Sequence, residues 1–569
     1  MIIRRHYIFI IFLALASTYS LGQQQGLVHP WMIFNNNDIP AIKTKLAMPA
    51  NAAIYKTLGS GTGLKYILYG DLTDLADVKK NCFNLVLSAR SRMVSTDAYA
   101  PFQWGRRMQE LIIPISLVIN NTSSPYTAEE IARLRLSCDS IAWRFRDSTY
   151  SEVAKYHNIN NRTVDEIMGV AFAGVFMFPD NPNAANHYAY VKQELTRHLA
   201  DIGADGVWPE TTRYVGQAIL RCFLLFSRVE KNYLGNTSGL ISDPRLVSVI
   251  EGLMLTVCPK DILNGNARYA PAIGDAGWGD INFTYLRWAA AEMSSIDLEL
   301  SKELMGIWKM SKLPYSDGVY KSYELILTDA EALAQTDTSF VLPSVIQKNI
   351  GYYIFRNNFG TSSESYLITR LPNKYFGHRH FDCGAFSFFA NNTPLMLDAG
   401  VGLYANPDAS FYQSTVNHNV VCFKDVNGLN RNGLDQSALV LDTLLSADYD
   451  FVSANITPPY SIANKYIRST AFLKKIFNSV ILYDYVDSNT GMQHSNNLHT
   501  FSTSTDKLLV NGFNKTISHG YNGLDIEIDH LLPLSDITFS TVKFSSIDIP
   551  TSWPRNLANR KDVADMGNC

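Results

Sequence analysis

Three observations predict that this sequence folds as an α+β multidomain protein, with a helical domain first and a β-sandwich second. From about residue 37 to residue 312, apolar residues recur at the three- and four-residue spacing of amphipathic helices. From about residue 349 onward, the pattern changes to short runs rich in Tyr, Val, Ile, Phe and Thr, which favour strands. The chain has 569 residues, more than one hydrophobic core usually serves, so two or more domains are expected.

Capping signals mark the starts of several helices in the first half. Thr127 and Glu130 have the spacing of a capping box, and Thr163 with Glu166 predicts a second box that opens an apolar helix over 164–178. Many such helices in series, joined by loops of varied length, favour helical hairpins arranged in a ring or bundle. Further helix starts are predicted at Asp38 and Asp243.

The second half shows the pattern of an antiparallel sandwich. Asn-Gly turn signals separate some of its apolar runs. We assign 313–342 to a connection and 343–569 to the sandwich, and the end of the chain, 562–569, shows no clear strand pattern. The predicted strands include 352–355, 365–369, 385–389, 420–423, 480–485 and 524–529.

The first 22 residues have the pattern of a secretory signal peptide. Arg4, Arg5 and His6 precede the apolar run 7–16, which is followed by a polar, small-residue stretch. The apolar run is too short to span a bilayer, and no later run is long enough to do so. We therefore expect an exported protein, periplasmic or secreted, without a membrane span.

Composition excludes some classes of partner. A formal net charge of −3 argues against a general nucleic-acid-binding protein. The seven cysteines are scattered, odd in number and without a C-x-x-C motif, so they define no disulfide framework. The abundant aromatic residues are compatible with stacking on sugar rings, and equally with ordinary cores.

The strongest candidate for chemistry is G-H-R-H-F-D at residues 377–382. In an extended strand His378 and His380 would point to the same face. Together with Asp398 in L-D-A-G and His418 in N-H-N, His380 supplies the nitrogen and oxygen ligands that zinc favours. Taken singly, each histidine is more often a half-buried, hydrogen-bonded residue.

Three loops of the helical half are candidates for a binding site. H-N-I-N-N-R-T at 157–163 places two amides and an arginine before a helix, as an anion site would, although the amides could simply shape the turn. D-G-V-W-P-E-T-T-R-Y at 205–214 places Tyr214 beside Arg213, where a tyrosine could serve as general base and then acid. I-G-D-A-G-W-G-D at 273–280 carries Asp275, and a plain glycine-rich connector is an equal reading of it.

The order of these motifs resembles the heparinase II/III-like family of polysaccharide lyases, to which oligoalginate lyases are related. The resemblance covers nearly the whole mature chain and implies an N-terminal (α/α) toroid at 23–312 followed by the antiparallel β-sandwich. It implies β-elimination on an acidic, uronic-acid-containing polysaccharide, either a glycosaminoglycan such as heparin or heparan sulfate, or alginate.

The resemblance also implies roles for individual residues. Asn161 would neutralise the uronate carboxylate, Tyr214 would be the catalytic acid and for one substrate epimer also the base, and His378 would be the opposing base. The residues that resemble the family's metal ligands, with a structural zinc ion the expected cofactor, are His380, Asp398 and His418.

A second set is expected to bind substrate or to support the loops that do. Glu210 resembles the family's acidic position beside the tyrosine loop. Arg162 stands where many relatives have histidine; a guanidinium cannot act as a general base, but it can neutralise a carboxylate or simply point away. The set is completed by Arg213, Trp208 and Trp278.

Two other functions remain open from the sequence. A toroid glycoside hydrolase would need two carboxylates, for which Glu210 and either Asp275 or Asp280 are the candidates. A catalytically inert glycan-binding protein of the same fold would rely on aromatic platforms. The candidates for such platforms are Trp104, Trp208 and Trp278. A homodimer is also possible.

Overall fold

A computed structural model describes most of the chain from Pro30 onward. The predicted signal peptide lies outside the described residues. The described residues are 30–93, 100–119, 124–156, 159–202, 205–208, 210–235, 239–261, 266–277, 285–311, 318–327, 339–373, 377–398, 400–401, 413–424, 437–475, 479–489, 492–499, 508–510, 515–519, 525–529, 539–543 and 562–568.

The first half is helical, as predicted. Its α-helices are α1 (Ile39–Ala47), α2 (Pro49–Lys56), α3 (Leu64–Tyr69), α4 (Leu72–Val78), α5 (Asn84–Arg92), α6 (Ala100–Val118), α7 (Ala128–Phe145), α8 (Glu152–Tyr156), α9 (Asn161–Val170), α10 (Ala184–Ala200), α11 (Thr212–Tyr214), α12 (Arg221–Tyr233), α13 (Pro244–Met254), α14 (Leu286–Met293), α15 (Leu298–Ser311) and α16 (Gly318–Leu327). Short 3₁₀ or π segments are η1 (Asn36–Asp38), η2 (Lys79–Phe83), η3 (Ala171–Phe176), η4 (Val215–Leu220), η5 (Leu240–Ser242) and η8 (Thr415–Asn417).

The capping boxes explain where two long helices begin. Thr127 caps α7 and receives the reciprocal bond from Glu130, as predicted. For α9 the prediction was wrong about the cap. Asn160 is the N-cap residue, and Thr163 is the third helical residue that completes the box, so the helix begins three residues earlier than expected. Asparagine caps a helix as well as threonine does. Asn160, three residues before Thr163, therefore serves as the cap and satisfies N–H groups of the first helical turn.

The second half contains antiparallel strands, and each of the six predicted runs overlaps one of them. The strands are β1 (Val345–Gln347), β2 (Tyr352–Asn357), β3 (Ser365–Arg370), β4 (Phe386–Ala390), β5 (Thr393–Met396), β6 (Val421–Lys424), β7 (Leu439–Leu445), β8 (Tyr449–Asn455), β9 (Ala463–Leu473), β10 (Ser479–Ser488), β11 (Gln493–Leu498), β12 (Leu508–Val510), β13 (Lys515–His519), β14 (Asp525–Asp529), β15 (Phe539–Lys543) and β16 (Asp562–Asn568).

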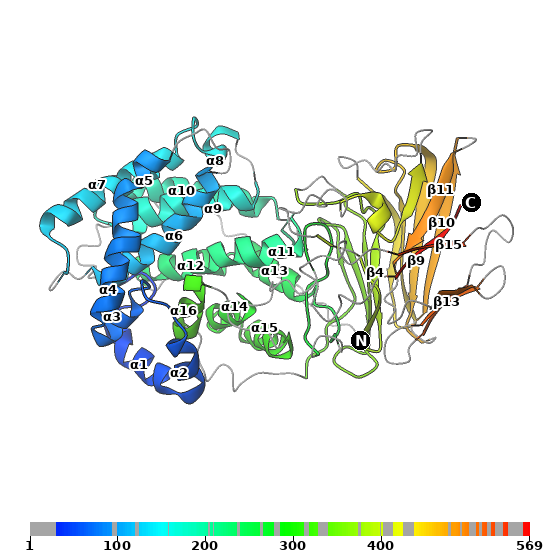
Figure 1. The fold of residues 1–569 in the computed structure, drawn as a ribbon, viewed down its shortest axis with the longest axis horizontal. Helices are drawn as coiled ribbons and strands as arrows, with labels where there is room; N and C mark the ends of the chain where they lie inside the picture. Colours follow the sequence, from blue (N-terminus) through cyan, green and yellow to red (C-terminus); the bar gives the residue numbers. More distant parts are fainter. Residues whose placement is uncertain are drawn as a thin grey trace, which may run out of the picture.

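These strands form four sheets with the orders β1-β2-β3-β4-β5, β10-β9-β8-β7, β15-β16-β11-β6 and β12-β13-β14. The sheet that contains β4 lies next to the helical half, whereas β9 and β10 lie farther out (Figure 1). The end of the chain, for which the sequence suggested no strand, pairs as β16 with β15 and β11. Cross-strand partners distant in sequence therefore decide its conformation.

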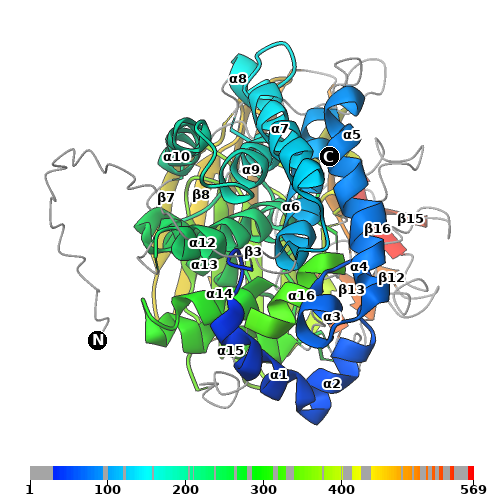
Figure 2. The same ribbon diagram turned by 90° about the vertical axis from the view of Figure 1, so that its left-hand side faces the viewer.

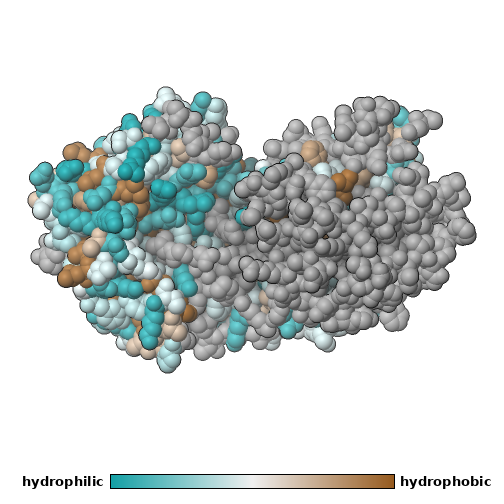
Figure 3. All heavy atoms as spheres, viewed as in Figure 1, coloured by the Kyte–Doolittle hydropathy of each residue, from teal (hydrophilic) through white to brown (hydrophobic). Residues whose placement is uncertain are grey.

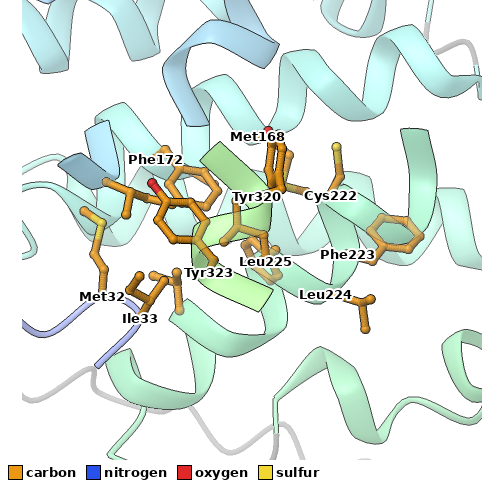
Figure 4. Packing of buried hydrophobic residues seen from close by; sticks show 14 of the residues in the cluster. Met32, Ile33, Met168, Phe172, Cys222, Phe223, Leu224, Leu225, Tyr320 and Tyr323 are labelled. Atoms are coloured by element: carbon orange, nitrogen blue, oxygen red, sulfur yellow. The ribbon is translucent and has the colours of Figure 1, made fainter. Parts of the chain in front are cut away.

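Helices of the first half share a common apolar core. Figure 2 views these helices with the sandwich behind them. Met168 of α9, Phe223 of α12 and Tyr323 of α16 all belong to this core (Figure 4). Helix α16 lies inside 313–342, which the sequence assigned to a connection, and its tyrosines belong to the helical core. On the face shown in Figure 3, the described residues of this half are mainly hydrophilic, with some apolar residues among them.

A smaller core joins the two halves. Val207 and Ile273 of the helical half are buried in one cluster with Ile354 of β2 and Ile368 of β3. Because this cluster is continuous across the boundary, the loops of the helical half are held against the first sheet of the sandwich. Among the described helices, none is long and apolar enough to cross a membrane.

Candidate functional site

The predicted catalytic residues Tyr214 and His378 meet at the boundary between the halves. Tyr214 ends α11, which lies at the side of the helical half that faces the sandwich (Figure 1). His378 lies in the turn that precedes β4. Their rings are stacked, with centroids 3.7 Å apart and planes inclined by 17°. Tertiary contact thus brings together two side chains that are 164 positions apart in the sequence.

His378 has a backbone conformation that a non-glycine residue seldom adopts. Its φ is 63°, so the chain turns at His378 itself. The prediction of an extended strand with both histidines on one face was therefore wrong about the backbone. Asp382 holds the turn by two short contacts, 2.7 and 2.5 Å, with the Arg370 guanidinium at the end of β3.

A single carboxylate nevertheless draws both histidines to the same side. Asp275 Oδ2 lies 2.8 Å from His378 Nδ1, and Asp275 Oδ1 lies 2.9 Å from His380 Nε2. The sequence had marked Asp275 as part of a glycine-rich loop and as a candidate hydrolase carboxylate, but not as a partner of these histidines. The sequence signal that could have found Asp275 is the glycine directly before it, Gly274. In the structure Gly274 has a φ of +58°. A Cβ on Gly274 would lie 2.6 Å from the His378 carbonyl oxygen, so this close approach requires glycine.

Glu210 lies on the other side of the His378 ring, with Oε1 3.4 Å from Nε2. It is buried, and its Oε2 accepts the Trp208 indole N–H and the Asn161 backbone N–H, each at 2.8 Å. Burial raises the pKa of the Glu210 carboxyl, although His378 and these two donors act to lower it. Glu210 therefore ties the tyrosine loop to the start of α9 and to the turn that bears His378.

Asn161 is the first residue of α9 and is 6% exposed. Its side-chain oxygen is buried and makes no hydrogen bond within the described part of the protein. A buried amide atom that has no protein partner is unusual and calls for an explanation, such as a ligand. The N-terminus of α9 adds a positive dipole end at the same place, which favours an anion.

The two arginines of the predicted substrate-binding set contact different partners. Arg162 Nη1 lies 3.5 Å from Glu152 Oε1 of α8 and is one-third exposed. Arg213 Nη1 lies 3.5 Å from the Asp275 carbonyl oxygen, at the boundary. The charge of Arg162 also acts on Glu210, where it partly opposes the rise in pKa that burial causes.

The predicted metal ligands form two pairs. His418 Nδ1 lies 3.1 and 2.9 Å from the two oxygens of Asp398, while His380 is paired with Asp275. Burial lowers the pKa of His418, but the Asp398 carboxylate opposes it and the net pKa is raised. The His380 and His418 rings lie 5.4 Å apart, and the remaining nitrogens, His380 Nδ1 and His418 Nε2, are buried without a hydrogen-bond partner. Across the described residues, no three His, Cys, Asp or Glu side chains converge as a ligand set.

The aromatic residues expected to bind sugar are mostly unavailable for that task. Trp208 is completely buried, and Trp104 is 9% exposed. Trp208 therefore supports Glu210 through its indole N–H and cannot present a stacking face to a sugar. Trp278 and Asp280 lie outside the described residues.

Comparisons with known proteins agree with this architecture. Residues 343–453 match the family model described as heparinase II/III-like, C-terminal. The solved structure of heparan sulfate lyase HepC from Pedobacter heparinus is 15% identical with a TM-score of 0.61, over 89% of this chain and 72% of that chain. A structure of heparinase III is 14% identical with a TM-score of 0.63, over 89% and 73%. No curated protein matches the sequence.

The likeness to these structures extends over both halves, and at such identities it shows the fold: a helical toroid followed by an antiparallel β-sandwich. The segment matched by the family model contains His378, His380, Asp398 and His418. The segment 343–453 therefore matches the heparinase II/III-like C-terminal domain, and the chain as a whole has the fold of the heparinase III structures.

Proposed function

We propose that this protein is an exported polysaccharide lyase that cleaves uronic-acid-containing chains by β-elimination. The observation that carries the proposal is the stacked pair of Tyr214 and His378 between the two halves. A general base and a general acid at one place are what the reaction requires. The heparan sulfate lyase fold makes heparan sulfate the first substrate to test, and alginate remains a candidate.

The residues allow each chemical step to be assigned. The Asn161 amide at the N-terminus of α9 would bind the uronate carboxylate and so acidify the C5 proton. His378 Nε2 would take that proton, because Nδ1 lies 2.8 Å from Asp275 whereas Nε2 lies 3.4 Å from Glu210, so Nδ1 is best assigned as the N–H donor. The Tyr214 hydroxyl would protonate the departing oxygen at C4. The C5–H and C4–O bonds break, and a C4–C5 double bond forms.

The glycoside hydrolase alternative is disfavoured by how its two carboxylates lie. Glu210 and Asp275 face opposite nitrogens of the same imidazole. The His378 ring therefore fills the space in which a hydrolase would hold the scissile bond between two carboxyl groups. The glycan-binding alternative loses support because Trp104 and Trp208 are buried.

A product assay tests the proposal directly. The mature protein is incubated with heparan sulfate, heparin, chondroitin sulfate, hyaluronan, alginate and an uncharged glucan, and near-ultraviolet absorbance is followed. Elimination creates a conjugated, unsaturated uronate that absorbs there, so we expect a rise with at least one uronate polymer and none with the glucan. New reducing ends without absorbance would indicate hydrolysis. Binding without either signal would support an inert glycan-binding protein.

We also propose that His380 and His418 bind a structural zinc ion. Two imidazoles that share a tetrahedral zinc ion through bonds of about 2.0–2.1 Å have ring centroids about 5 Å apart, and these two are 5.4 Å apart. The carboxylates of Asp275 and Asp398 hold the opposite nitrogens, as carboxylates do behind zinc-bound histidines. In this arrangement Asp398 orients His418 instead of acting as the third ligand. Elemental analysis of the purified protein, compared with a His418→Ala variant, tests this. Equal zinc content in both would contradict it.

A further inference from the structure

Asp275 is the one side chain of the helical half that contacts both histidines of the G-H-R-H motif within the described residues. Its carboxylate is 4% exposed, and its two oxygens serve different rings, Oδ2 facing His378 Nδ1 and Oδ1 facing His380 Nε2. Neither histidine could move away without breaking a charge-assisted contact in a water-poor site.

The backbone reinforces this arrangement. The Asp275 N–H donates to the His378 carbonyl oxygen at 3.0 Å, so His378 is held through both its backbone and its ring. Gly274, with φ +58°, allows the loop to approach this closely. His378 needs such support because its own φ of 63° is unfavourable and persists only where the surroundings impose it.

We propose that Asp275 is a positioning residue for His378. It holds Nδ1 as the protonated nitrogen, leaves Nε2 as the basic one, and keeps the ring stacked on Tyr214. Through its second oxygen it fixes His380 at the same time, so the orientation of the base is coupled to that of the buried His380–His418 pair. The catalytic part of this inference rests on the proposed lyase activity; the structural part does not.

The test compares Asp275→Asn with Asp139→Asn. Asp139 of α7 also pairs with a histidine, with its Oδ1 3.3 Å from His187 Nε2, but it lies outside the predicted site loops. In a protein labelled with ¹⁵N-histidine, and with His378→Gln used for assignment, Asp275→Asn should move the ring-nitrogen signals of His378 and His380. It should also lower kcat about 10- to 100-fold with KM changed less than about 2-fold, because the substrate-binding groups stay in place. Asp139→Asn should move the signals of His187 only and leave the kinetics unchanged.

The outcomes separate this inference from the proposed function. Unchanged His378 signals in Asp275→Asn would overturn the positioning role whether or not the protein is a lyase. Shifted signals with unchanged kcat would overturn its catalytic importance. A wild-type protein that forms no unsaturated product would remove the proposed function and with it the catalytic part, while the spectra would still decide the structural part. If Asp275→Asn does not fold, Asp275→Glu, which keeps the charge but moves it by one methylene, should shift both signals and lower kcat.

Discussion

Tyr214 and His378 touch face to face, and in the proposed reaction the tyrosine hydroxyl is the general acid. Tyr214→Phe keeps the stacked ring and removes only the hydroxyl. We expect kcat on the responsive polymer to fall by about 10²- to 10⁴-fold, the usual contribution of a general acid. Circular dichroism should remain that of the wild type.

Tyr366→Phe is the matched control for that substitution. It removes a buried hydroxyl at the same boundary, where Tyr366 donates to the Thr256 carbonyl oxygen at 3.1 Å. We expect turnover to be retained. Substantial turnover by Tyr214→Phe, or equal losses in both variants, would contradict the assignment of Tyr214 as the acid.

Glu166 links the stability of the helical half to pH. It is 1% exposed, and burial raises its pKa from 4.5 to about 7 even though Ser151 Oγ, at 2.5 Å, and the Val153 N–H donate to it. The folded protein therefore holds a proton that the unfolded chain releases between about pH 4.5 and 7. The stability that this proton contributes is complete below pH 4.5 and lost as pH rises through 7, a change of about 3 kcal/mol.

Glu166→Gln cannot titrate, so it isolates this effect. The free energy of unfolding of Glu166→Gln minus that of the wild type should be more positive at pH 8 than at pH 5, as measured by urea denaturation, because only the wild type loses stability as the pH rises. The fixed cost of weaker hydrogen bonds to Ser151 is the same at both values and cancels in the comparison. A difference between the two proteins that is independent of pH would contradict the raised pKa of Glu166.

At the scale of the element, the N-cap of α9 sets the position of Asn161. Asn160 Oδ1 accepts the N–H groups of Arg162 and Thr163 at 2.9 and 3.0 Å. Asn160→Ala should lower the free energy of unfolding by about 1 kcal/mol and also reduce kcat/KM, because the first turn that carries Asn161 loosens. Asn160→Asp, which can still cap, should restore both.

The control for this substitution is the capping box of α7, which does not carry a predicted site residue. Thr127 accepts the Glu130 N–H at 3.1 Å. Thr127→Ala should cost about the same stability, again about 1 kcal/mol, with kcat/KM unchanged. If the two variants lose activity equally, the effect at α9 is one of general stability and not of the position of Asn161.

Elements also show where sequence patterns stop being sufficient. Capping signals and the spacing of apolar residues located α7, α13 and the main strands, because both are local properties of the sequence. It did not reveal η3 and η4, which extend α9 and α11 with wider turns. Nor did it reveal the turn at His378, since its φ depends on the Arg370–Asp382 contact and on the loop at Asp275. π-helical turns and strained residues often lie at functional sites, and here η4 follows Tyr214 directly.

At the scale of the whole molecule, a buried ion pair helps to join the halves. Arg268 of the helical half makes two contacts, 2.9 and 2.6 Å, with Glu364 of the sandwich, and both side chains are almost completely buried. Glu364→Gln leaves the guanidinium buried without its counter-charge. We expect the free energy of unfolding to fall by about 3–5 kcal/mol, as measured by urea denaturation.

An exposed pair provides the comparison for Glu364→Gln. Lys302 and Glu299 lie 3.0 Å apart on the surface of α15. Glu299→Gln should change stability by less than about 1 kcal/mol, because exposed pairs are well solvated. A cost for Glu364→Gln no larger than this would show that the Arg268–Glu364 pair contributes little to holding the halves together.

The sequence by itself determined the order of the two folds, the family resemblance and the identity of the residues at the boundary, because periodicity, caps and short motifs are written locally along the chain. Only the tertiary structure decided which of those residues meet. It stacked Tyr214 on His378, buried Trp208 behind Glu210, turned Asp398 toward His418 and placed Asp275 between two histidines. These contacts join segments far apart in sequence, and they follow from the packing of the boundary core, which no local pattern encodes.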